Sequence, residues 1–319
     1  MILARIYGGV VAARNSMYDH GIFKPRHLNW PVVSVGNISA GGSGKTPFVI
    51  ALRELLLGRG IDISVLSRGY RRSSSGVLSV DPSGTPEKFG DEPLLIARKL
   101  RCAVTVGENR YSAGTYAEHQ YIGASQCPMH LLDDGFQHRQ LHRDFDIVLL
   151  NREDLDDELL PRGHLREPPA SLRRADAVVI DGAVPLDWLP KGAFQVWRIE
   201  REITIPELNV PVIAFCGIAR PQRFFTALRS AGLDVREEVT FRDHHRYTAA
   251  DVNRLAASRA RLHGSALVTT EKDAINLSAQ FDTLKPVVVP MHIRFADPEN
   301  AVKYLLGTLT ERCARAGLH

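Results

Sequence analysis

Cysteine is scarce in this chain, and its placement argues against a metal-binding or disulfide-bonded framework. Among 319 residues there are four cysteines, Cys102, Cys127, Cys216 and Cys313. They form no C-x-x-C pair and no histidines cluster beside them, so no structural zinc site is expected. Reduced, buried thiols in a reducing cytosol are the interpretation that fits.

Long apolar runs are also lacking. The chain begins MILARIYGGVVAARNSMYDHGIFKPRHLNWP, where Arg5 and Arg14 interrupt the ~18 apolar residues that a membrane-spanning helix needs. A clean signal-peptide cleavage pattern is missing as well. Two interpretations of this segment stay open, an interfacial helix on an anionic membrane or a terminal helix packed on its own domain. The residues that would line one helical face are Ile2, Leu3, Ile6, Tyr7, Val10 and Val11.

An excess of charge of either sign is absent too. Forty Lys and Arg against 36 Asp and Glu leave a formal net charge of +4, and we expect no nucleic-acid partner. The composition, 44% hydrophobic and 24% charged, is typical of a soluble globular protein. A chain of 319 residues is long enough for two domains that each bury a core.

Short β-branched and apolar runs alternate with helical patterns and predict an α/β fold. Residues 32–35 form a strand before a glycine-rich loop, a helical pattern follows, and IDISVLS (61–67) is the next strand of a βαβ unit. Continuous apolar strands are typical of a parallel sheet covered on both faces. Further strands are predicted at 102–106, 129–133, 145–150, 176–180, 212–217, 267–270 and 287–290, with helices near 222–231 and 298–312.

The stretch VGNISAGGSGKTPF (35–48) is a phosphate-binding loop with one departure. Gly44, Lys45 and Thr46 satisfy the end of the Gly-x₄-Gly-Lys-Ser/Thr pattern, whereas Ser39 stands where the first glycine is expected. The loop's glycines let backbone amides turn toward phosphate oxygens at the positive end of a helix. Lys45 would reach the β- and γ-phosphates, and the Thr46 hydroxyl would hold Mg²⁺. The flanking strand and helix favour this interpretation over a chance Gly-Lys-Thr.

The loop also suggests how the chain is divided. We expect a P-loop NTPase-type domain, with a mainly parallel sheet flanked by helices, over residues 1–190. A proline-containing linker follows at 191–210. A second, smaller α/β domain is expected at 211–319, and its last helix could pack back on the first domain.

The string MHLLDDGFQH (129–138) is an apolar strand that ends in two carboxylates. An acid in this place supports a phosphate-bound magnesium ion in nucleotide-binding proteins. The residues do not say which of Asp133 and Asp134 faces the metal.

Two other strings hold candidate catalytic side chains with an ordinary structural alternative. Asp91, in GDEPLLIARKL, could accept the proton of an attacking hydroxyl, but it precedes a helical pattern as an N-cap does. His244 and His245, in FRDHHRYT, precede a helix opened by Thr248, and adjacent histidines in a loop are more often solvated. From the residues alone we favour the cap and the solvated loop.

Guanine recognition is not expected. Its Asn/Thr-Lys-x-Asp pattern fails in TTEKDA (269–274), because Lys272 and Asp273 are adjacent. ATP is therefore the expected nucleotide.

Taken together, these motifs resemble the tetraacyldisaccharide 4'-kinase family of lipid A biosynthesis over nearly the whole chain. Several of the strings have no reason to occur together in an unrelated P-loop protein. In chain order they are VGNISAGGSGKTP, LSRGY, GDEP, GENR, LLDDGFQH, LLPRGHLREP, DHHRYT and TTEKDA.

The resemblance implies ATP- and Mg²⁺-dependent phosphorylation of the 4'-hydroxyl of a disaccharide 1-phosphate that carries four acyl chains. It implies a peripheral protein at the cytoplasmic face of the bacterial inner membrane, with the N-terminal helix as the membrane contact. Asp91 is then the catalytic base and His244 its partner, with His245 left open as the alternative. The other implied site residues are Gly41, Gly42, Ser43, Gly44, Lys45 and Thr46 for the nucleotide, Thr46, Asp133, Asp134 and Glu167 for the metal, and Tyr70 and Arg110 for the substrate.

Two other classes of function remain as alternatives. A nucleotide-switch ATPase of the metal-insertion or partitioning type would use the loop to drive assembly, yet the chain has no compact cysteine motif for a metal cargo. A peripheral membrane-binding module would leave the phosphate loop and LLDDGFQH without a purpose.

Overall fold

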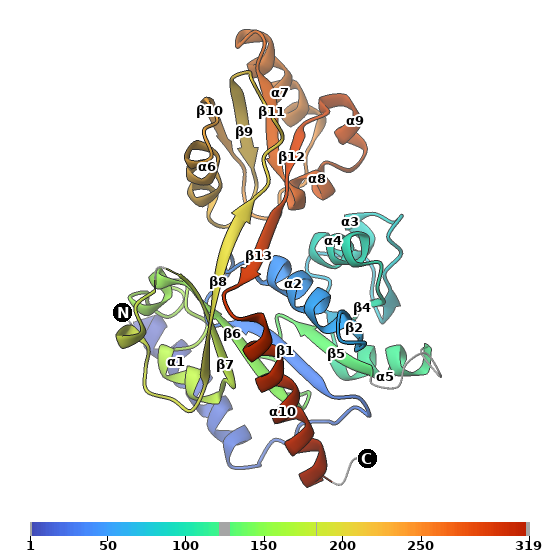
Figure 1. The fold of residues 1–319 in the computed structure, drawn as a ribbon, viewed down its shortest axis with the longest axis vertical. Coiled ribbons are helices and arrows are strands. Elements are labelled where there is room, and N and C mark those ends of the chain that lie inside the picture. Colours follow the sequence, from blue (N-terminus) through green and yellow to red (C-terminus); the bar gives the residue numbers. More distant parts are fainter. Residues whose placement is uncertain (1, 121–127, 183, 317–319) are drawn as a thin grey trace.

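The computed structural model describes residues 2–120, 128–182 and 184–316, which form two β-sheets with helices around them (Figure 1). The larger sheet has nine strands, and a separate, parallel sheet has four. The α/β fold with a large, mainly parallel sheet and a second, smaller sheet is thus confirmed. The large sheet runs in the order β13 (Met291–Phe295), β8 (Gln195–Ile203), β7 (Ala177–Asp181), β6 (Phe145–Leu150), β1 (Val32–Asn37), β5 (Pro128–Asp133), β2 (Asp62–Ser67), β4 (Val104–Val106), β3 (Leu78–Ser79), and the small sheet in the order β10 (Val235–Thr240), β9 (Val212–Cys216), β11 (Ala266–Thr270), β12 (Val287–Val289).

Helices cover both sheets, and short 3₁₀ segments join several of the elements (Figure 1). Those near the large sheet are α1 (Ile2–Asp19), α2 (Lys45–Leu57), α3 (Pro86–Phe89), α4 (Asp91–Leu100), α5 (Arg110–Gln120), η1 (Arg152–Leu155), η2 (Pro169–Arg174), η3 (Leu186–Trp188) and α10 (Pro298–Ala316). Those near the small sheet are α6 (Pro221–Ser230), α7 (Ala249–Arg261), α8 (Glu271–Leu277), η4 (Ser278–Gln280) and α9 (Phe281–Leu284).

The centre of the large sheet is the β1–loop–α2 unit. All six residues of β1 are buried between β5 and β6, as its β-branched composition predicts. Gly44 is the N-cap of α2 and has φ 80°, a left-handed conformation that strains any residue with a side chain. The glycine loop is therefore held at the carboxyl end of a central strand, directly before a helix.

The segment expected as a linker contains β8. This strand pairs with β7 on one side and with β13 on the other, in antiparallel register from Met291↔Ile203 to Phe295↔Ile199. Figure 1 shows β8 and β13 side by side at the edge of the large sheet, reaching up toward the small sheet. The β8 strand is only partly buried and alternates apolar with charged residues, so it lacks the continuous apolar run by which the other strands are predicted.

The end of the chain lies with the large sheet. Buried residues of α10, among them Leu305 and Leu309, share one core cluster with Val33 of β1 and Phe145 of β6. Together with the pairing of β13, this places residues 291–316 beside the large sheet. The small sheet and its helices therefore span 212–289, rather than all of 211–319.

The two sheets also meet through helices, because α8 packs against α4. Ile275 of α8 belongs to the same core cluster as Leu94 of α4. This contact brings Asn276 of α8 beside Asp91 of α4, two residues that are far apart in the sequence.

Candidate functional site

The glycine loop holds Lys45 between two side chains at the ends of neighbouring strands. The Lys45 ammonium donates to Asn37 Oδ1 at 3.0 Å and lies 3.3 Å from Asp134 Oδ1. Asn37 ends β1 and Asp134 follows β5, and these two parallel strands are adjacent in the sheet. The lysine that the sequence assigns to phosphate is thus positioned at the carboxyl edge of the sheet before any ligand is bound.

Ser39, the departure from the usual loop pattern, has a structural use. It is buried, and the Asn37 side-chain amide donates to its carbonyl oxygen at 2.8 Å and to its hydroxyl at 3.2 Å. The turn of the loop is made by Gly41 and Gly42, which both have positive φ. Glycine at 41 and 42 therefore gives the conformational freedom that glycine at 39 would otherwise give.

The adjacent acids Asp133 and Asp134 have opposite electrostatic environments. Burial tends to raise the pKa of Asp134, but Lys45 and the Nη1 atom of Arg166, which donates to both carboxylate oxygens at 2.9 and 3.1 Å, hold it well below its usual range. For Asp133, burial together with the charges of Glu92 and Asp134 raises the pKa to about 7. Asp134 is therefore already paired, whereas Asp133 is a buried acid that lacks a full counter-charge.

A magnesium ion fits this arrangement. Asp133 accepts a hydrogen bond from Ser67 through Oδ2, while its buried Oδ1 has no hydrogen-bond partner among the described residues. Mg²⁺ binds through one or two carboxylates together with phosphate oxygens and water. Within the described ranges no cluster of three or more His, Cys, Asp or Glu side chains suits a metal ion, so a dedicated protein cage is not part of this site.

Glu167 does not join these acids. Its fully buried carboxylate accepts hydrogen bonds from both guanidinium nitrogens of Arg174, at 2.9 and 3.1 Å, and from the Asn15 amide at 2.7 Å. With both oxygens bound, it ties α1 to the body of the domain. Its neighbour Arg166 is the residue of this string that reaches Asp134, so the geometry gives the expected metal role of Glu167 no support.

Asp91 and His244 meet between the two sheets. The His244 Nδ1 atom lies 2.8 Å from Asp91 Oδ2, which also accepts a hydrogen bond from the Asn276 amide at 3.1 Å. Burial tends to raise the pKa of Asp91, but the hydrogen bond from His244 and the charge of Lys272 lower it to about 2. The pair therefore provides a carboxylate that is ionised at neutral pH and held from two sides.

Position 91 is not a helix cap. Gly90 is the N-cap of α4, with φ 90°, and Asp91 is the first residue of the helix. A Cβ atom at position 90 would meet the Gly69 backbone at 3.1 Å. The close approach of these two backbone segments, together with the positive φ, therefore favours glycine there. The cap interpretation drawn from the sequence was wrong.

The two histidines also differ, and neither is simply solvated. His245 Nε2 lies 3.0 Å from Asp251, and its ring stacks on Phe241. Thr248 opens α7 with a capping box that includes the same Asp251. His245 therefore supports the start of α7, and His244 is the histidine that contacts Asp91.

Lys272 is a site residue that the sequence analysis missed. Its ammonium lies 3.2 Å from His244 Nε2 and 3.3 Å from both Glu92 and Asp243. An ammonium only donates, so Nε2 accepts and the imidazole proton lies on Nδ1, facing Asp91. Its signal is the string TTEKDA, which fails the guanine-binding pattern and is one of the strings that resemble the kinase family, without a role for Lys272.

Asp273, beside Lys272 in the same string, is structural. It accepts hydrogen bonds from the Gly217 amide and the Tyr247 hydroxyl, each at 2.8 Å. These bonds fix the turn after β9, whose Gly217 carbonyl in turn accepts from the His244 amide. The string thus combines one residue of the site with one that shapes the loop around it.

Tyr70 and Arg110, expected to face the substrate, have different neighbours in the site. Tyr70 is half exposed, and its ring makes an edge-on contact with His244 at 5.2 Å between centroids. Arg110 is buried; burial and the charge of Arg68 lower its pKa to about 10, although Asp133 and Asp134 act in the opposite direction. Arg110 is therefore still charged at neutral pH, and its charge acts on Asp133 and Asp134, the acids beside the phosphate loop.

The first helix carries an apolar face that the protein leaves uncovered. Tyr7 and Asn15 point inward, to the Arg166 carbonyl and to Glu167. Within the described ranges, no helix is both long enough and apolar enough to span a bilayer. The exposed apolar side chains are Ile2, Leu3, Ile6, Val10 and Met17 on α1, followed by Ile22 and Phe23.

The described thiols are free, as the sequence analysis expected, but Cys102 and Cys313 are only partly buried. Cys216 is buried. Cys127 lies outside the described residues.

Comparisons with known proteins cover nearly the whole chain. Residues 1–310 match the family model for "Tetraacyldisaccharide-1-P 4'-kinase". A tetraacyldisaccharide 4'-kinase of Koribacter versatilis is 46% identical, over 97% of this chain and 98% of that protein. One from Aquifex aeolicus is 37% identical, over 85% and 87%. Among solved structures, the "apo" form of LpxK from Aquifex aeolicus in complex with ATP has a TM-score of 0.77 at 33% identity, covering 96% of this chain and 97% of that chain.

Proposed function

This chain belongs to the tetraacyldisaccharide-1-P 4'-kinase family, and from that premise we propose how its residues carry out the reaction. The reaction is the ATP-dependent phosphorylation of the 4'-hydroxyl of a tetraacyldisaccharide 1-phosphate, a step of lipid A biosynthesis. The observation that carries the assignment of roles is the contact between Asp91 and His244, which joins the two sheets beside the phosphate loop.

Asp91 is the proposed general base. A sugar hydroxyl is a poor nucleophile, and a carboxylate that accepts its proton lowers the barrier to transfer. Oδ2 accepts from His244 and Asn276, whereas Oδ1 accepts from the Glu92 amide at 3.0 Å and keeps a second lone pair, which is the one proposed for the acceptor hydroxyl. His244 orients the carboxylate, and Lys272 fixes the tautomer of that histidine.

The phosphate loop is proposed to bind ATP and to neutralise the charge of the group in transfer. Phosphoryl transfer depends mainly on positioning and on electrostatic stabilisation. The amides from Gly41 to Thr46 would surround the phosphates. The Lys45 ammonium would leave Asp134 and contact the β- and γ-phosphates. Arg166 then remains as the counter-charge of Asp134.

Magnesium is the proposed metal. Asp133 and the Thr46 hydroxyl would hold it, and the bound ion would supply positive charge to the phosphate oxygens. The orphaned Oδ1 atom of Asp133 and its raised pKa support this choice over Asp134. Asp134 instead keeps Lys45 in place until the nucleotide arrives.

The membrane is the proposed partner surface. The substrate's acyl chains stay in a bilayer, so the enzyme has to approach them there, at the cytoplasmic face of the inner membrane. The exposed apolar side chains of α1, with Arg5 and Arg14 on the same helix, fit an interfacial helix beside anionic headgroups. Partial burial of α1 through Asn15 and Glu167 keeps the helix attached to the domain.

The test is direct transfer of label. Purified protein is incubated with γ-labelled ATP, Mg²⁺ and an acylated disaccharide 1-phosphate, and the lipid fraction is counted. Label in the lipid at a rate that depends on enzyme concentration supports the proposal. Hydrolysis of ATP with no label in the lipid would instead indicate a nucleotide-switch ATPase.

A further inference from the structure

A second contact between the two sheets lies directly on the phosphate loop. The turn after β9 brings Ala219 and Arg220 against the loop's glycines. A Cβ atom at Gly41 would lie 2.9 Å from Ala219 Cβ, and one at Gly42 would lie 2.9 Å from Arg220 Cγ. Side chains at either position would therefore push the small sheet away, so these glycines serve the contact as well as the turn.

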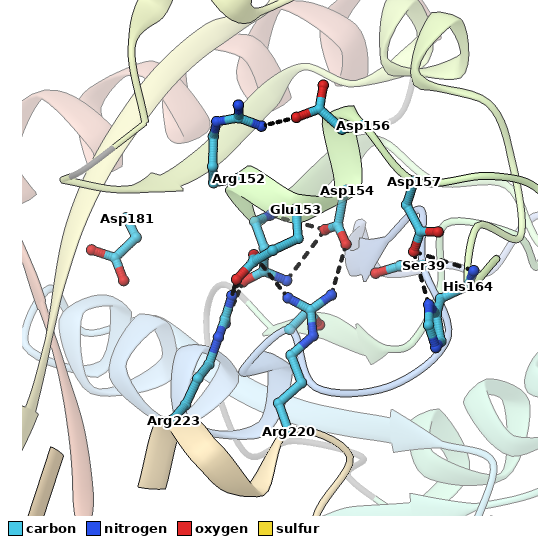
Figure 2. A network of polar contacts seen from close by, with 12 residues as sticks. Ser39, Arg152, Glu153, Asp154, Asp156, Asp157, His164, Asp181, Arg220 and Arg223 are labelled. Carbon is cyan, nitrogen blue, oxygen red and sulfur yellow. Dashed lines mark hydrogen bonds and ion pairs between the residues drawn. The ribbon is translucent and has the colours of Figure 1, made fainter. Parts of the chain in front are cut away.

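Arg220 continues from this contact to the acids of η1. Its guanidinium donates to Asp154 Oδ1 at 2.9 Å and to Glu153 Oε2 at 3.0 Å (Figure 2). Asp154 is fully buried, and its other oxygen closes the capping box of η1 with Asn151. Leaving a buried carboxylate oxygen without its charged partner costs free energy. The Arg220–Asp154 bond therefore strongly favours the seating of the small sheet on the large one.

Arg223, in the first turn of α6, also reaches η1 and the residue before it. It contacts Glu153 and donates to Asn151 Oδ1 at 2.9 Å (Figure 2). Arg201 of β8 links Asn151 to the loop, since it donates to Asn151 Oδ1 at 3.2 Å and to the Ser43 carbonyl at 3.0 Å. Arg220, the N-cap of α6, and Arg223 in its first turn thus both join the sheets, but of these two Arg220 also covers a glycine of the loop.

We propose that Arg220 is a positioning residue for the nucleotide. By binding Asp154 and Glu153 with its stem against Gly42, it couples the shape of the phosphate loop to the seating of the small sheet on the large one. The same seating brings His244 to Asp91. Binding of ATP and seating of the small sheet through Arg220 therefore favour each other, by the reciprocity that holds for any two linked equilibria.

This inference rests on the proposed nucleotide site, and its test does not need the lipid. Arg220→Met keeps a stem of similar length and removes the guanidinium, while Arg223→Met is the matched control from the first turn of the helix that Arg220 caps. The dissociation constant of ATP is measured by titration of the full chain without acceptor. We expect Arg220→Met to weaken ATP binding about tenfold or more and Arg223→Met to weaken it less than about threefold. Arg220→Lys, which keeps the charge, should fall between the parent and Arg220→Met.

Hydrogen exchange separates positioning from a general loss of stability. In the parent and in Arg223→Met, ATP should slow exchange of the amides at 243–248, around His244. In Arg220→Met this response to ATP should be lost, although the unliganded protein stays folded. Equal ATP affinities for the two methionine variants, or an unchanged exchange response in Arg220→Met, would overturn the inference. If Arg220→Met does not fold, Arg220→Lys decides by the same two measurements.

The outcome is distinguishable from failure of the proposed function. Should the parent transfer no label to the lipid, the assigned reaction is wrong while the ATP measurements still test the coupling. Should transfer occur and the coupling tests fail, only the role of Arg220 is withdrawn.

Discussion

The two ends of the site are built in different ways. The nucleotide end is local: Asn37, the glycine loop and Lys45 follow one another along the chain at the edge of one sheet. The acceptor end joins Asp91 to His244, which are 153 positions apart and belong to the neighbourhoods of different sheets. The first end is built from residues of the large sheet, with Ala219 and Arg220 of the small-sheet region set against its glycines. The second exists only while α8 and the loop around His244 are seated on α4.

This difference predicts how variants separate binding from transfer. Changes at the nucleotide end should weaken ATP binding, whereas changes at the acceptor end should leave ATP binding intact and slow the chemical step. A variant that moves both quantities would identify a residue that connects the two ends, which is the role inferred for Arg220.

The largest effect is expected for Asp91→Asn. The amide cannot accept the proton of the acceptor hydroxyl, so kcat should fall by about 10² to 10⁴. The ATP dissociation constant should stay within about twofold of the parent value. A kcat within tenfold of the parent would remove Asp91 from the role of base.

Lys45→Ala should cost about 10² to 10³ in kcat/KM, because one charged donor to the phosphates is lost. Unlike Asp91→Asn, it should also weaken ATP binding. Asp134 keeps Arg166 as a partner, so the variant should remain folded, which its circular dichroism and thermal unfolding would check. Normal ATP affinity in a folded Lys45→Ala protein contradicts the assigned loop.

Acid stability tests the acceptor end without substrate. The pKa of Asp91 is lowered from 3.8 to about 2, so the stabilising effect is complete above pH ~4 and is lost as pH falls through about 2. The corresponding free energy of unfolding is about 2 kcal/mol. The stability difference between the parent and Asp91→Asn should therefore shrink by that amount from pH 5 to pH 2. A difference that does not change with pH would mean that the carboxylate is not held as described.

The smallest effect concerns the membrane. Replacing Ile6 and Val10 of α1 by serine removes exposed apolar area and should lower partitioning onto anionic vesicles several-fold. ATP affinity should not change. Leu57→Ser, at an exposed position of α2, serves as the control and should bind vesicles like the parent. Equal partitioning of all three proteins would show that α1 is not the membrane contact.

What could be predicted from the sequence also differs between the nucleotide end and the acceptor end. The phosphate loop, the two acids after β5 and most strands could be predicted because each depends on a few consecutive residues. Strands β8, β10 and β13 were missed, because each is only partly buried and carries charged residues, so none forms the continuous apolar run by which the other strands are predicted.

At the acceptor end, the sequence supplied candidates but not their geometry. Gly90 rather than Asp91 caps α4, and only the approach of Gly69 explains why. Lys272 and Asn276 lie one turn apart on α8, and nothing local indicates that they face Asp91 and His244. Glu167 illustrates the converse, because its pairing with Arg174 and Asn15 is visible only in three dimensions.

A double-mutant cycle between Asp91 and His244 tests the central claim most directly. The rate constant of phosphate transfer to the lipid is measured at saturating ATP for the parent, Asp91→Asn, His244→Ala and the double variant. If the two side chains act as one unit, the double variant should be about as slow as Asp91→Asn alone. If the two losses multiply, the residues act independently and the account is contradicted.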